Sequence, residues 1–266
     1  MRADDVCGAT QQSECKRVLS IIIPALNEAA NLERHLPDLF RVCPDAEVIV
    51  VDGGSTDGTP EVVSRFPQAK LMFAPRCRAR QMNAGAECAS GETLLFLHAD
   101  TTLPTDAPDA LTEALGRPDV VGGRFDVRFD DSRRIFNVVA TMMNVRSRLS
   151  GIFTGDQAIF VRRRLFEAMG GYADVPLMED IDFTRRLKRR GRLACLRLHV
   201  TTSARKWERE GALRTIALMW MLRFLYFAGV SPARLHGWYY GRRANTRLNE
   251  WSPSESGNAR QTNRRV

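Results

Sequence analysis

Acidic side chains follow three short apolar runs of this chain, and a fourth stands at the start of a predicted helix. The first three are Glu28, Asp52 and Asp100, and the fourth is Asp180. Carboxylates are suitable ligands for Mg²⁺ and Mn²⁺, and a carboxylate can also accept a proton as a general base. The pattern predicts a metal and diphosphate site with a base beside it.

The three apolar runs are typical of buried strands and span residues 18–24, 47–51 and 93–97. Ligands of an open α/β sheet bind beyond the carboxyl ends of its strands. We therefore expect the loops at 24–28 and 52–59 to hold a nucleotide. The second loop contains three glycines, which permit a tight turn of the backbone.

Asp180 belongs to a segment, residues 178–191, in which acids crowd the front and bases crowd the back, before Gly191. This order matches the helix macrodipole and the usual glycine stop. Two interpretations stay open from the residues alone. The acids cap a solvated basic helix, or Asp180 is a catalytic base.

Four motifs, in this order and spacing, resemble those of family 2 glycosyltransferases with the GT-A fold. They are IIPALNE at 22–28, VVDGGSTDGT at 50–59, FLHAD at 96–100 and MED at 178–180. Within the family the chain looks most like a small bacterial group associated with radical-SAM and selenobiotic genes. The resemblance implies a single α/β domain of the GT-A type, with a mixed central sheet flanked by helices.

The resemblance also implies roles for individual residues. Asp180 matches the general base, and Asp100 matches the last acid of a metal-binding Asp-x-Asp motif. His98 stands where the family usually has the first aspartate, and imidazole ligates Mn²⁺ or Mg²⁺ less readily than a carboxylate. The expected metal ligands are Asp100, His98 and His199, although a lone histidine is more often structural. The expected nucleotide and donor residues are Pro24, Leu26, Asn27, Glu28, Asp52, Ser55, Asp57, Arg78, Arg80 and Asp100.

The segment at 155–157 is similar to the acceptor-side loop of the family, although a plain turn is an alternative. Arg78 and Arg80 are expected to contact the donor diphosphate, the alternative being ordinary surface arginines. The expected acceptor-binding residues are Gly155, Asp156, Gln157, Glu179 and Trp207.

Cleavage of a sugar–diphosphate bond leaves negative charge on the nucleotide, which a cation and arginines stabilise. One base without a covalent nucleophile implies direct displacement with inversion at the sugar carbon. The predicted function is an inverting glycosyltransferase that uses a nucleotide-diphosphate sugar and an unidentified acceptor hydroxyl. The alternative is a catalytically weak nucleotide-sugar-binding scaffold at a membrane surface. His98 keeps this alternative open because it stands where the family usually has an aspartate.

The composition limits the classes of partner and enzyme that fit this chain. The chain has 266 residues and a formal net charge of +8, which favours anionic partners. No nucleic-acid-binding signature accompanies this charge, so no nucleic acid partner is expected. No Gly-x-Gly-x-x-Gly or Gly-x-x-x-x-Gly-Lys motif occurs, which argues against a dehydrogenase or a P-loop enzyme. The six cysteines form no C-x-x-C pair, which favours reduced thiols in a cytoplasmic protein.

The chain is expected to form a GT-A domain at 18–210 and a C-terminal helical segment at 211–248, between disordered tails at 1–17 and 249–266. The polar N-terminus lacks the apolar core of a signal peptide. Residues 216–230 are the most apolar stretch, shorter than the roughly 20 residues of a membrane span. They form a core helix, or they lie in an anionic membrane interface at the inner face of the plasma membrane. In the second case lipid phosphates would meet Arg214, Arg223, Arg234, Arg242 and Arg243.

Overall fold

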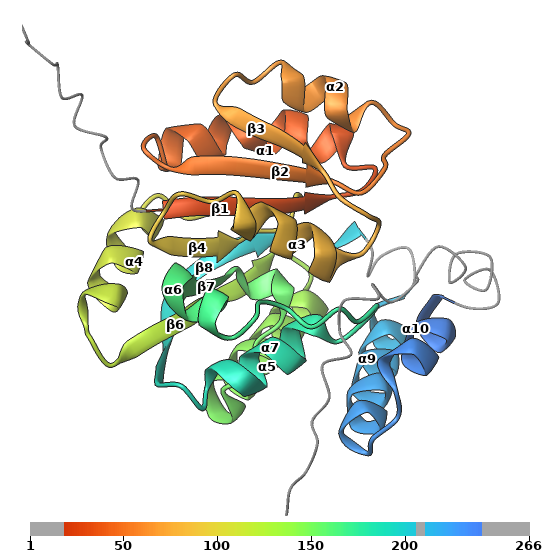
Figure 1. Ribbon diagram of the computed structural model, residues 1–266. Helices are drawn as coiled ribbons and strands as arrows, with labels where there is room; N and C mark the ends of the chain where they lie inside the picture. Colours follow the sequence, from red (N-terminus) through yellow and green to blue (C-terminus); the bar gives the residue numbers. More distant parts are fainter. Residues whose placement is uncertain (1–18, 206–210, 241–266) are drawn as a thin grey trace, which may run out of the picture.

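A computed structural model describes residues 19–205 and 211–240. In these residues one eight-stranded sheet has helices on both faces (Figure 1). The strand order is β3-β2-β1-β4-β7-β6-β8-β5. The strands are β1 (Leu19–Ala25), β2 (Glu47–Asp52), β3 (Ala69–Phe73), β4 (Thr93–Phe96), β5 (Thr101–Thr102), β6 (Val120–Phe129), β7 (Ile159–Arg162) and β8 (Arg192–Thr202).

The direction of the strands changes at β7. Strands β1 to β4 pair in parallel, whereas β7 runs antiparallel to both β4 and β6. Every residue of β2 is buried, as expected for a strand covered by helices on both faces. The mixed sheet predicted from the sequence is therefore present, and this reversal has consequences for the site.

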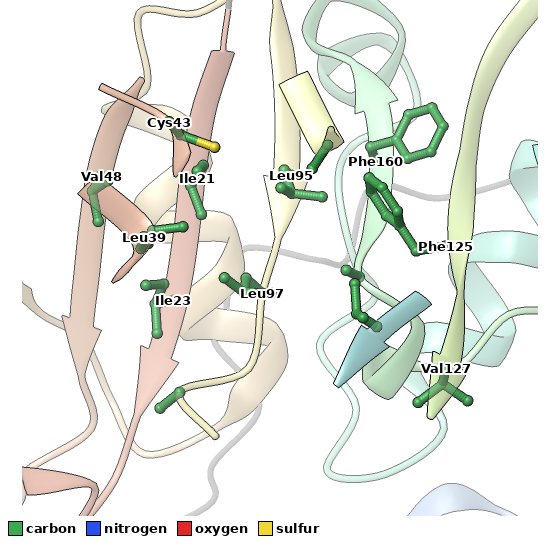
Figure 2. Packing of buried hydrophobic residues seen from close by; sticks show 14 of the residues in the cluster. Ile21, Ile23, Leu39, Cys43, Val48, Leu95, Leu97, Phe125, Val127 and Phe160 are labelled. Atoms are coloured by element: carbon green, nitrogen blue, oxygen red, sulfur yellow. The ribbon is translucent and has the colours of Figure 1, made fainter. Parts of the chain in front are cut away.

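Two apolar layers cover the sheet. On one face Ile21, Ile23, Val48 and Leu95 pack against a cluster that includes Leu39 of the first helix (Figure 2). On the other face a second cluster joins alternate residues of the same strands to α3, α6 and α7. The helices are α1 (Ala29–Val42), α2 (Thr59–Ser64), α3 (Arg78–Glu87), α4 (Ala107–Gly116), α5 (Arg134–Ser150), α6 (Arg163–Ala168), α7 (Glu179–Leu187), α9 (Ala212–Phe227) and α10 (Pro232–Tyr240).

Helix α9 contains most of the apolar segment singled out in the sequence, and it lies with α10 near α5 and α7 (Figure 1). Leu222 and Leu235 are buried in a small cluster with Ile152 and Ile181. On the opposite side Phe224 is 73% exposed. The helix is thus buried on one side and exposes apolar side chains on the other. Among the residues with described structure, no helix is both long and apolar enough to cross a bilayer.

Candidate functional site

A cavity of about 700 Å³ opens where β1 and β4 end and where α7 begins. Many of the residues expected to bind donor, metal or acceptor line it, although they come from distant parts of the chain. These are Pro24, Asn27, Glu28, Arg78, His98, Asp100, Gly155, Asp156, Glu179 and Asp180.

The sheet brings the 98–100 and 155–157 segments together. Because β4 and β7 are antiparallel, with Phe96 opposite Ile159, the end of β4 lies beside the start of β7. The 3-10 turn η1 (Gly155–Gln157) comes just before that start. His98 and Asp156 therefore meet, with 3.1 Å between His98 Nδ1 and Asp156 Oδ1.

The two loops expected to hold the nucleotide are hydrogen-bonded to each other. The Asn27 N–H donates to Ser55 Oγ at 2.8 Å, and Asn27 Oδ1 accepts from the Thr56 N–H at 2.8 Å. Asp57 Oδ2 accepts from the N–H of Ala29, in the first turn of α1, at 3.0 Å. Asn27 has a φ of 57°, a left-handed conformation that asparagine tolerates better than most residues. These contacts assign Ser55 and Asp57 to shaping the loop pair, and neither lines the cavity.

Asp52, like Ser55 and Asp57, shapes the 52–59 loop. The residue is 1% exposed, and its carboxylate accepts hydrogen bonds from the Gly54 and Ser55 N–H groups at 2.8 and 2.9 Å. The Ser55 hydroxyl also donates to it. Asp52 thus stabilises the 52–59 turn, and its carboxylate does not line the cavity. Leu26 is absent from the lining as well.

Gln81 is a structural residue that the sequence did not single out. Its buried Nε2 donates to the carbonyls of Ala25 and Val51, both at 2.8 Å. It therefore joins the ends of β1 and β2 from helix α3. No local pattern marks this role, because the two carbonyls lie 56 and 30 residues away in the chain.

Asp180 lies in the first turn of α7, after Met178, whose φ of 68° turns the chain into the helix. Asp180 Oδ2 accepts from the Gly155 N–H at 3.0 Å, and Oδ1 accepts from the Ile181 N–H at 2.7 Å. The carboxylate is thus held against the 155–156 turn at the cavity wall. This geometry suits a proton acceptor with a fixed orientation.

His98 faces the same turn. Its Nε2 is buried without a hydrogen-bond partner among the described residues, and a Cβ at residue 155 would collide with it. Since Nδ1 lies beside Asp156, both ring nitrogens point toward the 155–156 turn. This arrangement differs from the expected metal-ligand role of His98.

Glu28 and Asp100 supply the acids of the donor side. Burial raises the pKa of the Glu28 carboxyl, and the nearby Asp100 charge raises it further, although Asn31 and Arg205 lower it. Arg205 Nη2 in turn donates to Asn31 Oδ1 at 2.7 Å. Two neighbouring carboxylates of this kind would be stabilised by a cation between them.

The donor set fits a divalent cation only in part. In the described ranges no three histidine, cysteine or acidic side chains converge on one metal position. Mg²⁺ is commonly bound by one or two carboxylates together with substrate phosphates and waters. Asp100 and Glu28 match that kind of site, which a diphosphate would complete.

The arginines expected on the donor have different surroundings. Arg78 lines the cavity, 3.6 Å from Glu179, whose pKa is raised by burial and by the neighbouring Asp180. Arg80 instead forms two hydrogen bonds with Asp174, at 2.8 and 2.9 Å, and does not line the cavity. The structure therefore brings one of the two expected arginines to the site.

Three further expected residues lie elsewhere. Gln157 is completely buried and donates to Ser147 of α5 at 3.0 Å, so it supports the turn from behind. His199 is exposed within β8, opposite Asp126, whereas the cavity is reached by Thr202 at the strand end. Strand β8 continues past His199 to Thr202, so His199 does not stand at the strand end. Trp207 lies outside the described residues.

The open α/β sheet, the loops at its strand ends and the shared cavity define the GT-A class of nucleotide-diphospho-sugar transferase folds. The model of the family "Glycosyl transferase family 2" matches residues 20–170. This chain belongs to that family and is a glycosyltransferase.

Relatives and solved structures agree with this assignment. A PGL/p-HBAD biosynthesis glycosyltransferase of Mycobacterium tuberculosis is 32% identical over 212 residues, covering 70% of this chain and 76% of the relative. The succinoglycan biosynthesis protein ExoA of Rhizobium meliloti is 31% identical over 191 residues, 64% of this chain and 58% of that protein.

Among solved structures, a mannosyltransferase of Pyrobaculum calidifontis in complex with GDP-Man and Mn²⁺ superposes with a TM-score of 0.55 at 25% identity. The match covers 69% of this chain and 56% of that one. S. aureus TarS in complex with UDP superposes with a TM-score of 0.59 at 18% identity, covering 70% and 60% of the two chains. The chain thus spans less than two thirds of each of these structures. The GT-A fold predicted from the sequence is confirmed.

Proposed function

We propose that this chain moves a sugar from a nucleotide-diphosphate donor to an acceptor hydroxyl, with inversion at the sugar carbon. The observation that carries the proposal is the place of Asp180. It shares one cavity with Glu28, Asp100 and Arg78, and its carboxylate is held there by the Gly155 N–H. A base and a leaving-group site are thereby available to one bound donor.

The reaction that this site supports is a single displacement. The acceptor hydroxyl gives its proton to an Asp180 carboxylate oxygen while its own oxygen forms a bond to the anomeric carbon. The bond from that carbon to the diphosphate oxygen breaks, and its electron pair leaves with the nucleotide. Arg78 is placed in the cavity to stabilise the charge that develops on the diphosphate.

Mn²⁺ or Mg²⁺ fits the donor side of this proposal, as in the mannosyltransferase complex with Mn²⁺. Asp100 and Glu28 would hold the ion, and the ion would neutralise charge on the leaving diphosphate. Their carboxylates would also orient the donor. His98 has a positioning role in this scheme, because it contacts the turn that holds Asp180.

Several finer expectations remain predictions. Gly155, Asp156 and Glu179 line the Asp180 side of the cavity and are proposed to contact the acceptor. Contact of α9 with an anionic membrane is supported by its exposed aromatic face. Membership of the radical-SAM and selenobiotic-associated group also stays a prediction.

A binding screen tests the proposal. The purified chain is mixed with UDP-, GDP- and dTDP-sugars, with and without Mn²⁺, and its melting temperature is measured. A donor at a hundred times its dissociation constant adds about 2.7 kcal/mol to the free energy of unfolding. Arg78→Gln should reduce this shift, whereas Arg80→Gln, which changes an arginine paired with Asp174, should leave donor affinity nearly unchanged. Absence of any shift with all of these donors would contradict the proposal.

Transfer of the sugar decides between the enzyme and the scaffold alternative. Release of nucleoside diphosphate from a donor that binds, with water as a slow substitute acceptor, should be measurable and should depend on Asp180. A donor that binds tightly and is never cleaved, with or without Mn²⁺, would favour the nucleotide-sugar-binding scaffold.

A further inference from the structure

Two arginines, Arg223 of α9 and Arg146 of α5, lie near Asp180, and only Arg223 lines the cavity. Arg223 lines the cavity together with Asp180 and Asp156. Helices α5 and α9 contact each other, and the charges of both arginines interact with the Asp180 carboxylate. One of the two interpretations of the sequence placed Arg223 on lipid phosphates, whereas in the structure Arg223 lines the cavity.

Arg146 has guanidinium atoms without partners. Its Nε and Nη2 are buried and form no hydrogen bond with the described residues, and Nη1 lies 3.5 Å from the Ile152 carbonyl. Burial and the neighbouring Arg223 charge lower the pKa of Arg146 to about 10. Burial also lowers the pKa of Arg223. Arg146 stays cationic at neutral pH, so two like charges lie near each other in a partly dry environment.

The nearest acids already have other partners. Both Asp180 oxygens accept backbone N–H groups, and Asp156 contacts His98. In the described chain no acidic oxygen lies within 4.0 Å of the Arg223 guanidinium, as an ion pair would require. A buried charge without a close counter-ion costs free energy that a bound anion would recover.

Two other arginines of the same region each have a carboxylate partner. Arg124 is completely buried, and both it and Arg148 bind the Asp126 carboxylate, with Arg148 Nη2 at 2.8 Å from Asp126 Oδ2. The fold therefore supplies carboxylate partners for arginines next to α5. The contrast sets Arg146 and Arg223 apart, because in the described residues Asp180 acts on both without forming an ion pair with either.

We propose that the acceptor carries a phosphate group that Arg223 binds beside Asp180, and that the charge of the buried Arg146 strengthens this binding. The inference rests on the proposed function. A guanidinium group binds two phosphate oxygens through paired hydrogen bonds, and a second positive charge nearby favours a dianion. The position suits the acceptor, because its hydroxyl must reach Asp180 while the donor diphosphate lies near Glu28 and Asp100. Arg223 also lies outside residues 20–170, the range matched by the family model.

Calorimetry with inorganic phosphate, glycerol 3-phosphate and dodecyl phosphate tests the inference on the full chain. Arg223→Gln should weaken phosphate binding at least tenfold, and Arg146→Gln should weaken it by a smaller factor. Arg214→Gln, an exposed arginine of the same helix, is the matched control and should leave it unchanged. Binding of all three probes identifies the phosphate itself as the ligand, and binding of dodecyl phosphate alone identifies a lipid-linked phosphate.

Two outcomes would overturn the inference. The first is phosphate affinity that is equal in wild type and Arg223→Gln, the variant that decides if Arg146→Gln does not fold. The second is affinity lost in Arg78→Gln but kept in Arg223→Gln, which would place the phosphate in the donor site. Nucleotide-sugar stabilisation is measured on the same preparations. If donors bind and none of the phosphate probes does, the inference fails while sugar transfer stands; if no donor binds, the proposed function fails too.

Discussion

Replacement of Asp180 by asparagine tests the proposed base with little change of shape. The carboxylate accepts two hydrogen bonds, from the Gly155 N–H at 3.0 Å and from the Ile181 N–H at 2.7 Å. An asparagine amide has one oxygen and one NH₂ group, so one of the two N–H groups loses its acceptor. The free energy of unfolding should fall by about 1–3 kcal/mol.

The effect on turnover should be larger. A general base contributes about 10²–10⁴-fold in rate, which corresponds to about 3–5 kcal/mol of barrier. The affinity for the nucleotide sugar should stay close to wild type, because the donor diphosphate is expected near Asp100 and Glu28. The expected increase in the activation free energy of transfer, per folded molecule, is therefore larger than the expected decrease in the free energy of unfolding.

Asp182→Asn is a matched control in the same helical turn. It removes the same charge from the start of α7 and breaks an ion pair with Arg186, whose Nε lies 2.9 Å from Asp182 Oδ2. Loss of the helix-dipole and surface-pair interactions should cost about 1 kcal/mol, with little effect on rate. Initial rates, melting temperatures and donor affinities are measured for both variants. If Asp180→Asn slows transfer no more than Asp182→Asn does, the acids merely cap the helix and the base assignment is wrong.

Three further predictions follow from named contacts. His98→Gln should lower the turnover rate without changing the Mn²⁺ concentration at half activity, because His98 contacts the 155–156 turn; a tenfold rise in that concentration would make it a metal ligand. Burial opposes ionisation of Glu47, but Lys70, Ser20 and Ser90 lower its pKa from 4.5 to about 2. Glu47 therefore stabilises the fold above pH 4.5 and loses this contribution as the pH falls toward 2, a loss that acid titrations of Glu47→Gln should not show. Trp220→Ser with Phe224→Ser should preserve folding, since both side chains are exposed, and should abolish sedimentation with anionic vesicles if α9 contacts membranes; sedimentation equal to wild type would count against that contact.

The sequence was informative where local pattern and chain direction are sufficient. Short apolar runs predicted β1, β2 and β4, and parallel strands necessarily bring their carboxyl ends to one edge. Glu28 and Asp100 could be placed near each other on that basis alone. The direction of an individual side chain could not be predicted in this way. Asp52 stands at the expected strand end, yet its carboxylate binds its own loop.

Contacts between distant elements were beyond the reach of local pattern. Arg223 follows apolar residues, and interleaved aromatics suggested a lipid-facing stripe. In the helix, however, Leu222 and Arg223 face the cavity, whereas Phe224 and Trp220 are exposed. The period of an α-helix predicts that these residues lie on two different faces. Which face packs on the domain depends on the tertiary contacts of α9, and local sequence does not show these contacts. Arg146 likewise became a candidate only when α5 and α9 were seen to touch.

The reversal of strand direction at β7 explains why one cavity can hold both the donor acids and the base. The parallel strands β1 and β4 deliver Glu28 and Asp100 to one edge of the sheet, and antiparallel β7 brings its amino end to that same edge. A parallel β7 of four residues would move the 155–157 turn about 13 Å away, at roughly 3.3 Å per residue. The Gly155 N–H could then not reach the Asp180 carboxylate. The orientation of the proposed base is therefore set by sheet topology through a backbone group, and changes in the 155–157 turn should act on it even where they remove no side chain of the cavity.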